Sequence, residues 1–320
     1  MHSWRVLILA SAACLAAAAA QAQSYPARPV RVVVPFPAGG NVDVFARVLF
    51  RQAELDIGQS FVIDNRGGAN GILGSDIVAN AAPDGYTVLV TSFAFAVNPA
   101  IMKKLPFDVV KDFAPVTKIA LGTGYLMVVH PSVPAKSVKE LIAVARKQPM
   151  RYSSAGIGNG QHLAGALFNM KTGLDILHVP YKGGGPALNA VLGGEVHIHY
   201  PAGSVGLPQV KAGRVRAIGF TGAQRLATLP DVPTVGESVP GYVSDAGWHA
   251  MFAPARTPPA IVSRLHEVVR KALQDPKVRD HFLDNGYEPR GDPPAEWAKA
   301  FRADLRKYAE IARAAKIEAQ

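Results

Sequence analysis

The sequence predicts an α/β protein of two lobes, each a mainly parallel sheet flanked by helices. Short β-branched runs alternate with longer amphipathic stretches, which is typical of helices layered on a parallel sheet. The chain of 320 residues is long enough for one large domain or two ordinary lobes. We expect residues 23–124 and 249–320 to form one lobe, with the C-terminal helices packing back onto it. Residues 125–248 are expected to form the other.

The first residues are typical of an export signal. Arg5 precedes an apolar run from Val6 to Ala20, and Ala20-Gln21-Ala22 has the small-x-small pattern of a cleavage site. The run is too short for a membrane span of about 20 residues, and no later stretch reaches that length. We therefore expect residues 1–22 to be a signal peptide cleaved near Ala22-Gln23, and the protein to be soluble and exported.

Composition excludes several classes of protein. The single cysteine, Cys14, lies inside the apolar run with no leucine three residues before it, which disfavours a lipoprotein. Without further cysteines, the fold must be stabilised by its core and not by disulfides. The net charge of +10 is spread along the chain without a long basic run, unlike a nucleic-acid-binding surface. A merely soluble basic surface and a mild field that draws anions into a cleft both stay open.

In the first third of the chain, each expected strand ends in a loop rich in Gly, Asn or Ser. The strands are expected at residues 30–35, 60–64 and 86–92. Helices are expected between them at about 42–55 and 74–81. Ligands of open α/β sheets sit beyond the carboxyl ends of the strands, so these loops are the first candidates for a binding site.

A second group of strands is expected at residues 125–130, 151–154, 176–181, 196–200 and 216–221. Helices are expected at 137–147 and 163–171, and Ser137 should cap the first with Glu140 as its capping-box partner. The chain should cross between the lobes at 126–130 and 247–253. Paired prolines open the C-terminal helices at 260–273 and 296–315, because proline costs little at a helix start.

The loop at residues 34–43, VPFPAGGNVD, joins the first strand to a helix. We expect the backbone to turn at Gly39-Gly40 and the helix to open near Asn41. Asp43 then lies in the first turn, where an acid complements the helix dipole by about 0.3 to 1 kcal/mol. Free N–H groups at that end can bind a carboxylate or phosphate. The loop matches neither a dinucleotide fingerprint nor a P-loop, and taken alone it is more simply a capped helix start.

Similar loops recur elsewhere in the chain. They lie at residues 65–71, 91–95 and 153–162, and each is rich in Gly, Asn, Ser or Ala. A single loop of this kind would stay ambiguous. Several donor-rich loops from two halves of a chain can converge on one small anion, so together they favour a ligand site.

Blocks of sequence throughout the chain resemble the Bug or TctC-like solute-binding proteins of tripartite tricarboxylate transport systems. The blocks are Tyr25-Pro26, residues 34–43, Asp64-Asn65-Arg66, and residues 82–86, 98–99, 104–108, 111–116, 179–183 and 229–234. The resemblance implies a two-lobed periplasmic binding protein fold, of type II or Venus-flytrap kind, that closes on a small organic acid. It further implies a membrane transporter as partner, no nucleic acid, no cofactor, no metal and no catalysis.

Carried onto this chain, the resemblance implies a ligand site centred on the first strand–helix loop. In the first lobe its residues are Phe36, Gly39, Gly40, Asn41, Asp43, Ala69, Asn70, Gly71, Ser92 and Phe93. In the second lobe they are Ser154, Gly158, Asn159, Gln161, His162 and Tyr200.

Two departures from the family pattern bear on the ligand. Asn159-Gly160 stands where many relatives carry two hydroxyl residues, so an amide can replace a hydroxyl contact. Tyr200-Pro201-Ala202 stands where many carry Phe-Asp-Asn, and the missing Asp leaves a ligand ammonium group without a partner. This disfavours an amino acid and favours a plain mono- or dicarboxylate. Phe36, Phe93 and Tyr200 would suit an aromatic acid or could be ordinary core.

A serine hydrolase is one alternative. Ser204 follows a strand in the setting AGSVG, Gly183 to Gly185 mimic an oxyanion loop, and Asp245 and His249 follow in hydrolase order. Pro201 at the strand end and a simple turn at the glycines disfavour it.

Two further alternatives concern metal and signalling. His197 and His199 alternate along one strand and so share a face, but no Cys and no close Asp complete a ligand set. A sensor whose closed form docks on a signalling receptor would use the same pocket as a transport protein, and the sequence leaves that role open.

Overall fold

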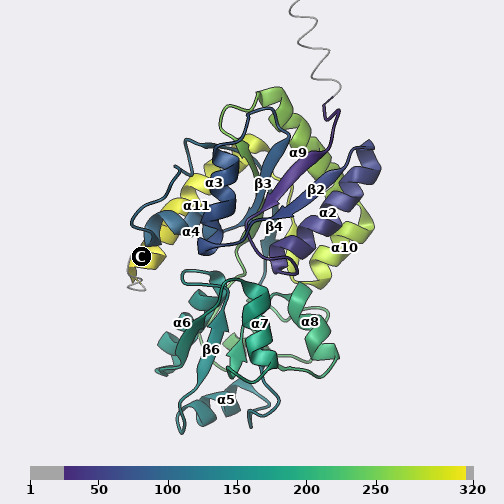
Figure 1. The fold of residues 1–320 in the computed structure, drawn as a ribbon. Coiled ribbons are helices and arrows are strands. Elements are labelled where there is room, and N and C mark those ends of the chain that lie inside the picture. The colour runs from purple at the N-terminus through teal and green to yellow at the C-terminus, as the bar shows by residue number, and fades with distance from the viewer. Residues whose placement is uncertain (1–24, 315–320) are drawn as a thin grey trace, which may run out of the picture.

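The computed structural model describes residues 25–314 as two lobes, one above the other in Figure 1. The expected signal peptide at residues 1–22 lies outside the described residues. Each lobe is a mixed sheet flanked by helices, so the expected two-lobed α/β fold is confirmed. Every strand expected from the sequence is present, with ends that differ by one or two residues. Within the described residues, no helix combines the length and apolar character that a membrane span needs.

The first lobe contains a six-stranded sheet in the order β11-β4-β10-β3-β1-β2. Its strands are β1 Val30–Val34, β2 Phe61–Asn65, β3 Thr87–Ser92, β4 Phe113–Gly122, β10 Trp248–Pro254 and β11 Tyr287–Pro289. Strands β1, β2 and β3 run parallel. Strand β10 runs antiparallel to β3 and β4, and β11 runs antiparallel to β4.

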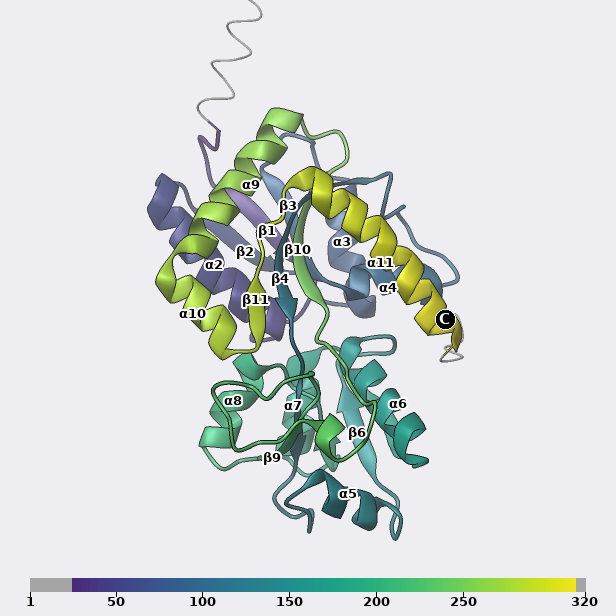
Figure 2. The ribbon, with the colours of Figure 1, turned by 180° about the vertical axis from the view of Figure 1, so that it is seen from behind.

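Helices cover both faces of this sheet (Figures 1 and 2). One face carries α2 Asn41–Ile57, α9 Pro259–Gln274 and α10 Pro276–Asp284. The other carries α3 Ile72–Ala79, α4 Ala94–Ile101 and α11 Pro294–Ala314, with the short 3-10 helix Ala69–Gly71 before α3. Phe95, Phe252 and Phe301 pack together between α4, β10 and α11, which fixes the C-terminal helix on the sheet.

The second lobe contains a five-stranded sheet in the order β7-β6-β8-β5-β9. Its strands are β5 Leu126–Val129, β6 Arg151–Ser154, β7 Leu177–Pro180, β8 Ile198–His199 and β9 Arg216–Phe220. Its helices are α5 Val138–Ala145, α6 Gly160–Thr172, α7 Gly184–Leu192 and α8 Gly203–Lys211, with a 3-10 helix at Val235–Glu237. Strand β6 pairs in parallel with β7 and β8, whereas β5 is antiparallel to β8 and β9.

Both sheets are mixed, whereas the sequence predicted mainly parallel ones. The reason lies in the two passages of the chain between the lobes. Strand β4 runs towards the second lobe and β10 returns from it, so the two must be antiparallel. The same argument holds for β5, which leaves the crossing, and β9, which leads back towards it.

The crossings themselves lie just before the strands that were expected to cross. Strand β5 belongs wholly to the second sheet and β10 wholly to the first, so the chain crosses at residues 123–125 and 245–247. The last residue of β4, just before the first crossing, is hydrogen-bonded to the second crossing. Gly122 N donates to Gly247 O at 2.6 Å, and Ala246 N donates to Gly122 O at 3.2 Å. The lobes are therefore joined by one paired connection.

One helix cap differs from the expected pattern. Ser137 caps α5, with the N–H of Glu140 donating to its hydroxyl oxygen at 3.2 Å. The Glu140 carboxylate accepts from Lys136 N at 2.7 Å and not from Ser137 N. The reciprocal half of the predicted capping box is therefore wrong, because Glu140 accepts from the residue before the expected one.

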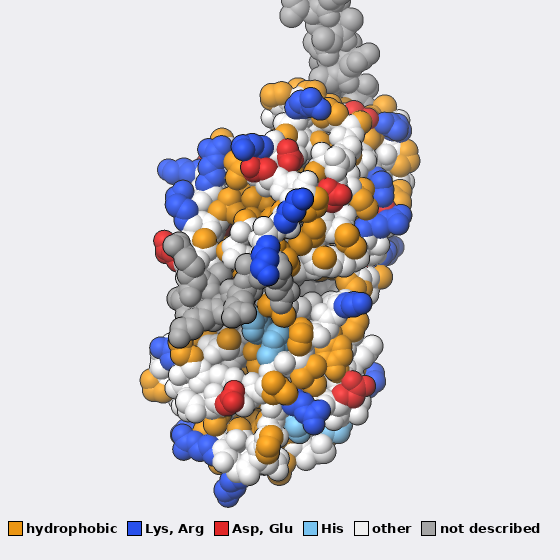
Figure 3. Space-filling model, turned by 60° about the vertical axis from the view of Figure 1, so that its left-hand side comes forward, with side chains coloured by type: hydrophobic (Ala, Val, Ile, Leu, Met, Phe, Trp, Pro, Cys, Tyr) orange, Lys and Arg blue, Asp and Glu red, His pale blue; other side chains and the backbone are white. Residues whose placement is uncertain are grey.

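The surface charge is spread, as the sequence predicts. On the face shown in Figure 3, Lys and Arg side chains are scattered over both lobes.

Candidate functional site

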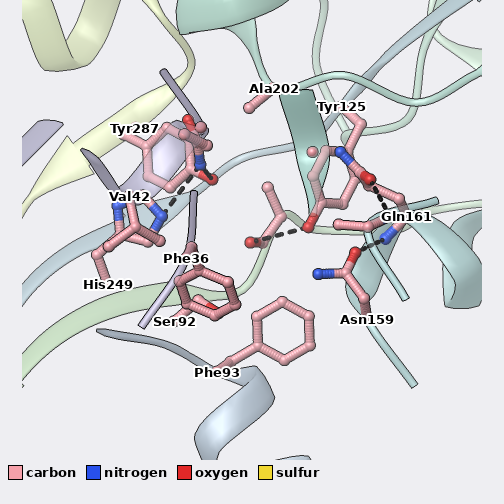
Figure 4. A pocket seen from close by; sticks show the side chains of 15 residues that line it. Phe36, Val42, Ser92, Phe93, Tyr125, Asn159, Gln161, Ala202, His249 and Tyr287 are labelled. Atoms are coloured by element: carbon pink, nitrogen blue, oxygen red, sulfur yellow. Dashed lines mark hydrogen bonds between the residues drawn. The ribbon is translucent and has the colours of Figure 1, made fainter. Parts of the chain in front are cut away.

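A pocket of about 60 Å³ lies where the two lobes meet (Figure 4). None of the described residues that line it is Lys, Arg, Asp or Glu. The first lobe contributes Phe36, Gly40, Asn41, Val42, Ser92, Phe93, His249 and Tyr287. The crossings contribute Tyr125 and Ala246, and the second lobe contributes Ala155, Asn159, Gln161, Gly184 and Ala202. The pocket is therefore uncharged, with aromatic walls and several amide and hydroxyl groups.

Five helices begin at this pocket. A residue at or next to the start of each helix lines it: Gly40 for α2, Phe93 for α4, Asn159 for α6, Gly184 for α7 and Ala202 for α8. The first N–H groups of a helix have no partner within the helix, and the helix dipole is positive at that end. Five such ends give the pocket a positive potential without any cationic side chain.

Most of these helix starts lack a side-chain cap. The N-cap residues Gly40, Phe93, Gly183 and Ala202 make no side-chain hydrogen bond to their helices. Only α6 is capped, because Asn159 Oδ1 accepts from Gln161 N at 2.9 Å. Uncapped first turns at a pocket leave their N–H groups for water or for an anionic ligand.

Interactions of Asp43, which does not line the pocket, stabilise the loop before α2. Gly39 has a positive φ of 75°, and its N–H donates to Asp43 Oδ2 at 2.8 Å. Asp43 Oδ1 accepts from Asn65 Nδ2 at 3.0 Å and pairs with Arg47 Nη2 at 2.9 Å. Burial opposes ionisation of Asp43, but the hydrogen bonds from Arg47, the Gly39 N–H and Asn65 outweigh it and lower its pKa. Asp43 therefore organises the loop and does not line the pocket.

Asn41 is the centre of a second hydrogen-bond network, at the pocket wall. Its Nδ2 donates to Tyr287 Oη at 2.7 Å and lies 3.0 Å from His249 Nε2. Its Oδ1 accepts from Ser204 Oγ, of the second lobe, at 2.6 Å. His249 and Tyr287 stack with their ring centroids 4.7 Å apart. The amide of Asn41 is therefore fixed in one orientation.

The geometry of Ser204 bears on the hydrolase alternative. Ser204 Oγ donates to Asn41 and makes no hydrogen bond to His249. His249 Nδ1 is buried with no hydrogen-bond partner among the described residues. Asp245, expected as the third member, accepts from Gly247 N at 3.0 Å. These three side chains do not form a nucleophile–base–acid triad here.

Comparison with known proteins identifies the family. The family described as the tripartite tricarboxylate transporter family receptor matches residues 45–316. Protein BugT of Bordetella pertussis is 34% identical over 302 residues, which cover 93% of this chain and 92% of BugT. This chain belongs to the tripartite tricarboxylate transporter receptor family. The resemblance seen in the sequence is thereby confirmed.

Solved structures of the family are similar over nearly the whole chain. Rpa4515 of R. palustris with adipate has a TM-score of 0.87 and 33% identity, covering 92% of this chain and 100% of that one. MatC (Rpa3494) from Rhodopseudomonas palustris with bound malate has a TM-score of 0.81 and 31% identity, covering 90% and 99%. Both similarities extend over the two lobes.

The pocket brings together seven of the residues predicted from the sequence. These are Phe36, Gly40, Asn41, Ser92, Phe93, Asn159 and Gln161. Gly39 and Asp43 lie beneath it in the loop just described. Ala69, Asn70 and Gly71 form the 3-10 helix, where Asn70 Nδ2 donates to Asn98 Oδ1 at 2.8 Å and so ties this loop to α4.

The remaining predicted residues belong to the second lobe and do not line the pocket. Ser154 Oγ lies 2.6 Å from His178 Nε2, and Gly158 N donates to His162 Nδ1 at 3.1 Å. The rings of His162 and His178 stack 4.0 Å apart, which holds this loop against β7. Tyr200 is 1% exposed and packs on Tyr152, so its ring belongs to the core.

Eight lining residues were not predicted individually: Val42, Tyr125, Ala155, Gly184, Ala202, Ala246, His249 and Tyr287. Of these, Val42 and Ala155 lie within the candidate loops at residues 34–43 and 153–162. The crossings carry a signal for two of them, Tyr125 and Ala246, because residues between two lobes border the space between them. The sequence gives no such signal for Tyr287, because nothing in the local pattern of the short strand β11 relates it to Asn41.

From the sequence, we expected His197 and His199 not to form a metal site. His197 Nδ1 accepts from Arg151 N at 3.0 Å, and His199 Nδ1 lies 2.9 Å from Ser153 Oγ. Among the described residues, no group of three or more His, Cys, Asp or Glu side chains could hold a metal ion.

Asp43→Asn tests the organising role of this carboxylate. The variant keeps the size of the side chain but removes the charge that faces Arg47 and the Gly39 N–H. We expect the free energy of unfolding to fall by about 1 to 3 kcal/mol, as for other buried polar groups that lose their partner. Urea unfolding measures this, with the exposed Asp231→Asn as the matched control. Equal losses in the two variants would contradict the role.

Two buried histidines should make the folded protein less stable as the pH falls. Burial lowers the pKa of His249 to about 3 and that of His199 to about 4, the latter partly opposed by a hydrogen bond with Ser153. Both values lie below the unfolded value of about 6.5, so the stabilisation is present above pH 6.5 and is lost as pH falls towards 4. We expect the free energy of unfolding to be about 2 to 4 kcal/mol lower at pH 5 than at pH 7. Equal values from urea unfolding at the two pH values would contradict this.

Proposed function

We propose that this protein binds a small organic carboxylate between its two lobes and delivers it to a membrane transporter of the tripartite tricarboxylate type. The observation that carries the proposal is the convergence of five helix N-termini on an uncharged pocket. Such a site attracts a negative charge and offers it hydrogen-bond donors.

The attraction from the helix ends is a substantial part of what binding requires. One helix N-terminus stabilises an anion by about 0.3 to 1 kcal/mol at an exposed site, and by up to about 2 kcal/mol when partly buried. Several ends acting on one carboxylate therefore supply a few kcal/mol. The amides of Asn159 and Gln161 and the hydroxyl of Ser92 border the same space and can fix the orientation of the ligand.

Relatives support the class of ligand. Rpa4515 was solved with adipate and MatC with malate, and both are organic dicarboxylates. In this chain, Phe36 and Phe93 line the pocket, and Figure 4 shows their rings with that of Tyr125 around the space that Asn159 and Gln161 border. An apolar or aromatic carboxylate would use these walls as well as the donors. The proposed ligand is therefore a mono- or dicarboxylate without an ammonium group.

The proposal assigns each part of the chain a role. Residues 23–124 and 249–320 form one lobe and residues 125–248 the other, and the paired crossings at 123–125 and 245–247 act as the hinge. Ligand contacts come from the seven predicted residues that line the pocket, with Gly39 and Asp43 supporting them. A signal peptide at residues 1–22 directs the protein to the periplasm, where its relatives act as binding proteins.

A thermal-shift screen of organic acids tests the function. The screen contains aliphatic monocarboxylates, dicarboxylates including adipate and malate, aromatic acids and amino acids. A ligand at 100 times its dissociation constant stabilises the folded state by about 2.7 kcal/mol, which raises the melting temperature measurably. We expect at least one acid without an ammonium group to do so. If only amino acids, or no acid at all, raise the melting temperature, the proposal fails.

A further inference from the structure

Ser204 makes a hydrogen bond that joins the two lobes at the wall of the pocket. It lies in the first turn of α8, in the second lobe, and its hydroxyl donates to Asn41 Oδ1 at 2.6 Å. Asn41 is the first residue of α2, in the first lobe, and lines the pocket. The sequence singled out Ser204 as a possible nucleophile, but its only hydrogen-bond partner among the described residues is this amide.

The acceptor of this bond cannot follow Ser204 if the lobes move apart. The amide nitrogen of Asn41 is held by Tyr287 Oη at 2.7 Å and faces His249 Nε2 at 3.0 Å. Tyr287 is 1% exposed and His249 is 2% exposed, and both belong to the first lobe. Because the amide is fixed to the first lobe, the bond from Ser204 exists only when the second lobe lies in the position seen here.

Glycines allow the two lobes to approach this closely. A Cβ atom on Gly203 would lie 2.4 Å from the carbonyl oxygen of Asn285, at the end of α10. A Cβ on Gly158 would lie 2.3 Å from the side chain of Ile101, and one on Gly183 would lie 2.8 Å from Pro37. Each of these contacts joins the second lobe to the first, and we infer from them that this arrangement is the closed one.

A second hydrogen bond between the lobes lies at the hinge. Thr228 Oγ1 donates to Asp284 O at 2.9 Å. Two residues further, Gly286 O accepts from Thr123 N at 2.8 Å, and Thr123 belongs to a crossing. Neither Thr228 nor Asp284 lines the pocket. Of these two bonds between the described parts of the lobes, the one from Ser204 couples lobe position to a pocket-lining residue.

We propose that Ser204 is the latch of the closed form: its hydrogen bond to Asn41 stabilises closure and thereby slows release of the ligand. Ser204 is a positioning residue, because it acts through Asn41 and does not line the pocket. The bond forms whenever the lobes close and must break before a bound ligand can leave, so it lengthens the residence time and leaves the association rate unchanged. The effect on ligand release rests on the proposed function, whereas the effect on closure does not.

Spin-label distance measurements on the full exported chain test the latch without any ligand. The labels are placed by Arg51→Cys in α2 and Lys139→Cys in α5, at exposed positions in opposite lobes. Cys14 is the chain's single cysteine and lies before the expected cleavage site, so the labels are specific. The variant is Ser204→Ala. Ser137→Ala is the matched control, because it removes a helix-capping hydroxyl at α5 that makes no contact with the first lobe.

We expect Ser204→Ala to reduce the ratio of closed to open molecules about fivefold, as the loss of one neutral hydrogen bond predicts. Gly203→Ala should also reduce it, because the added methyl group pushes α8 away from Asn285. Ser137→Ala should leave the ratio unchanged. With the tightest-binding acid from the screen, stopped-flow dissociation should be about fivefold faster in Ser204→Ala at an unchanged association rate.

A distance distribution in Ser204→Ala identical to that of the wild type would overturn the latch. A slower association rate with unchanged dissociation would do so as well, since it would place Ser204 in ligand capture. If no acid binds, the proposed function fails, while the distances measured without ligand still decide on the latch.

Discussion

The first N–H groups of a helix have no acceptor within that helix, and the site of this protein is built on that constraint. At α2, α4, α7 and α8 the N-cap residue supplies no side-chain acceptor, although Ser, Thr, Asp or Asn would do so at most helix starts. The four starts lie around one pocket instead of being dispersed over the surface. A bound anion can then serve as a shared cap for several helices.

The charged groups that support the site are kept out of the pocket. Asp43 and Arg47 pair beneath the first loop, where they fix the turn at Gly39 and the start of α2. A cation in the pocket would attract any anion and would itself require desolvation. The backbone dipoles at the helix ends are already oriented, so they avoid the desolvation cost of a buried cation. Because the charged pair stabilises the loop from outside and uncharged groups line the pocket, the pocket is both neutral and rigid.

The sequence predicted the features that depend only on neighbouring residues along the chain. Residues 34–43 define their own turn and helix start, so the loop, Asn41 as the opening of α2 and Asp43 in its first turn were all predictable. The antiparallel pairing of the strands next to the crossings was not predictable, because it follows from the path of the chain between the lobes. Strand β4 was missed since Pro115 and Lys118 interrupt its apolar pattern. Tyr287 and His249 reach Asn41 only through the tertiary fold, so no spacing rule could place them at the pocket.

The central claim is that the pocket holds a negative charge by means of helix N-termini, and one charge substitution tests it. Asn159→Asp keeps the side-chain size and the cap on α6 but adds a negative charge to the pocket wall. Calorimetry with the tightest-binding acid should show affinity reduced at least about tenfold, since like charges in a partly buried site repel by more than about 1.4 kcal/mol. The exposed Gln148→Glu, with the same change in net charge, should bind as the wild type does. Undiminished affinity in Asn159→Asp would contradict the account.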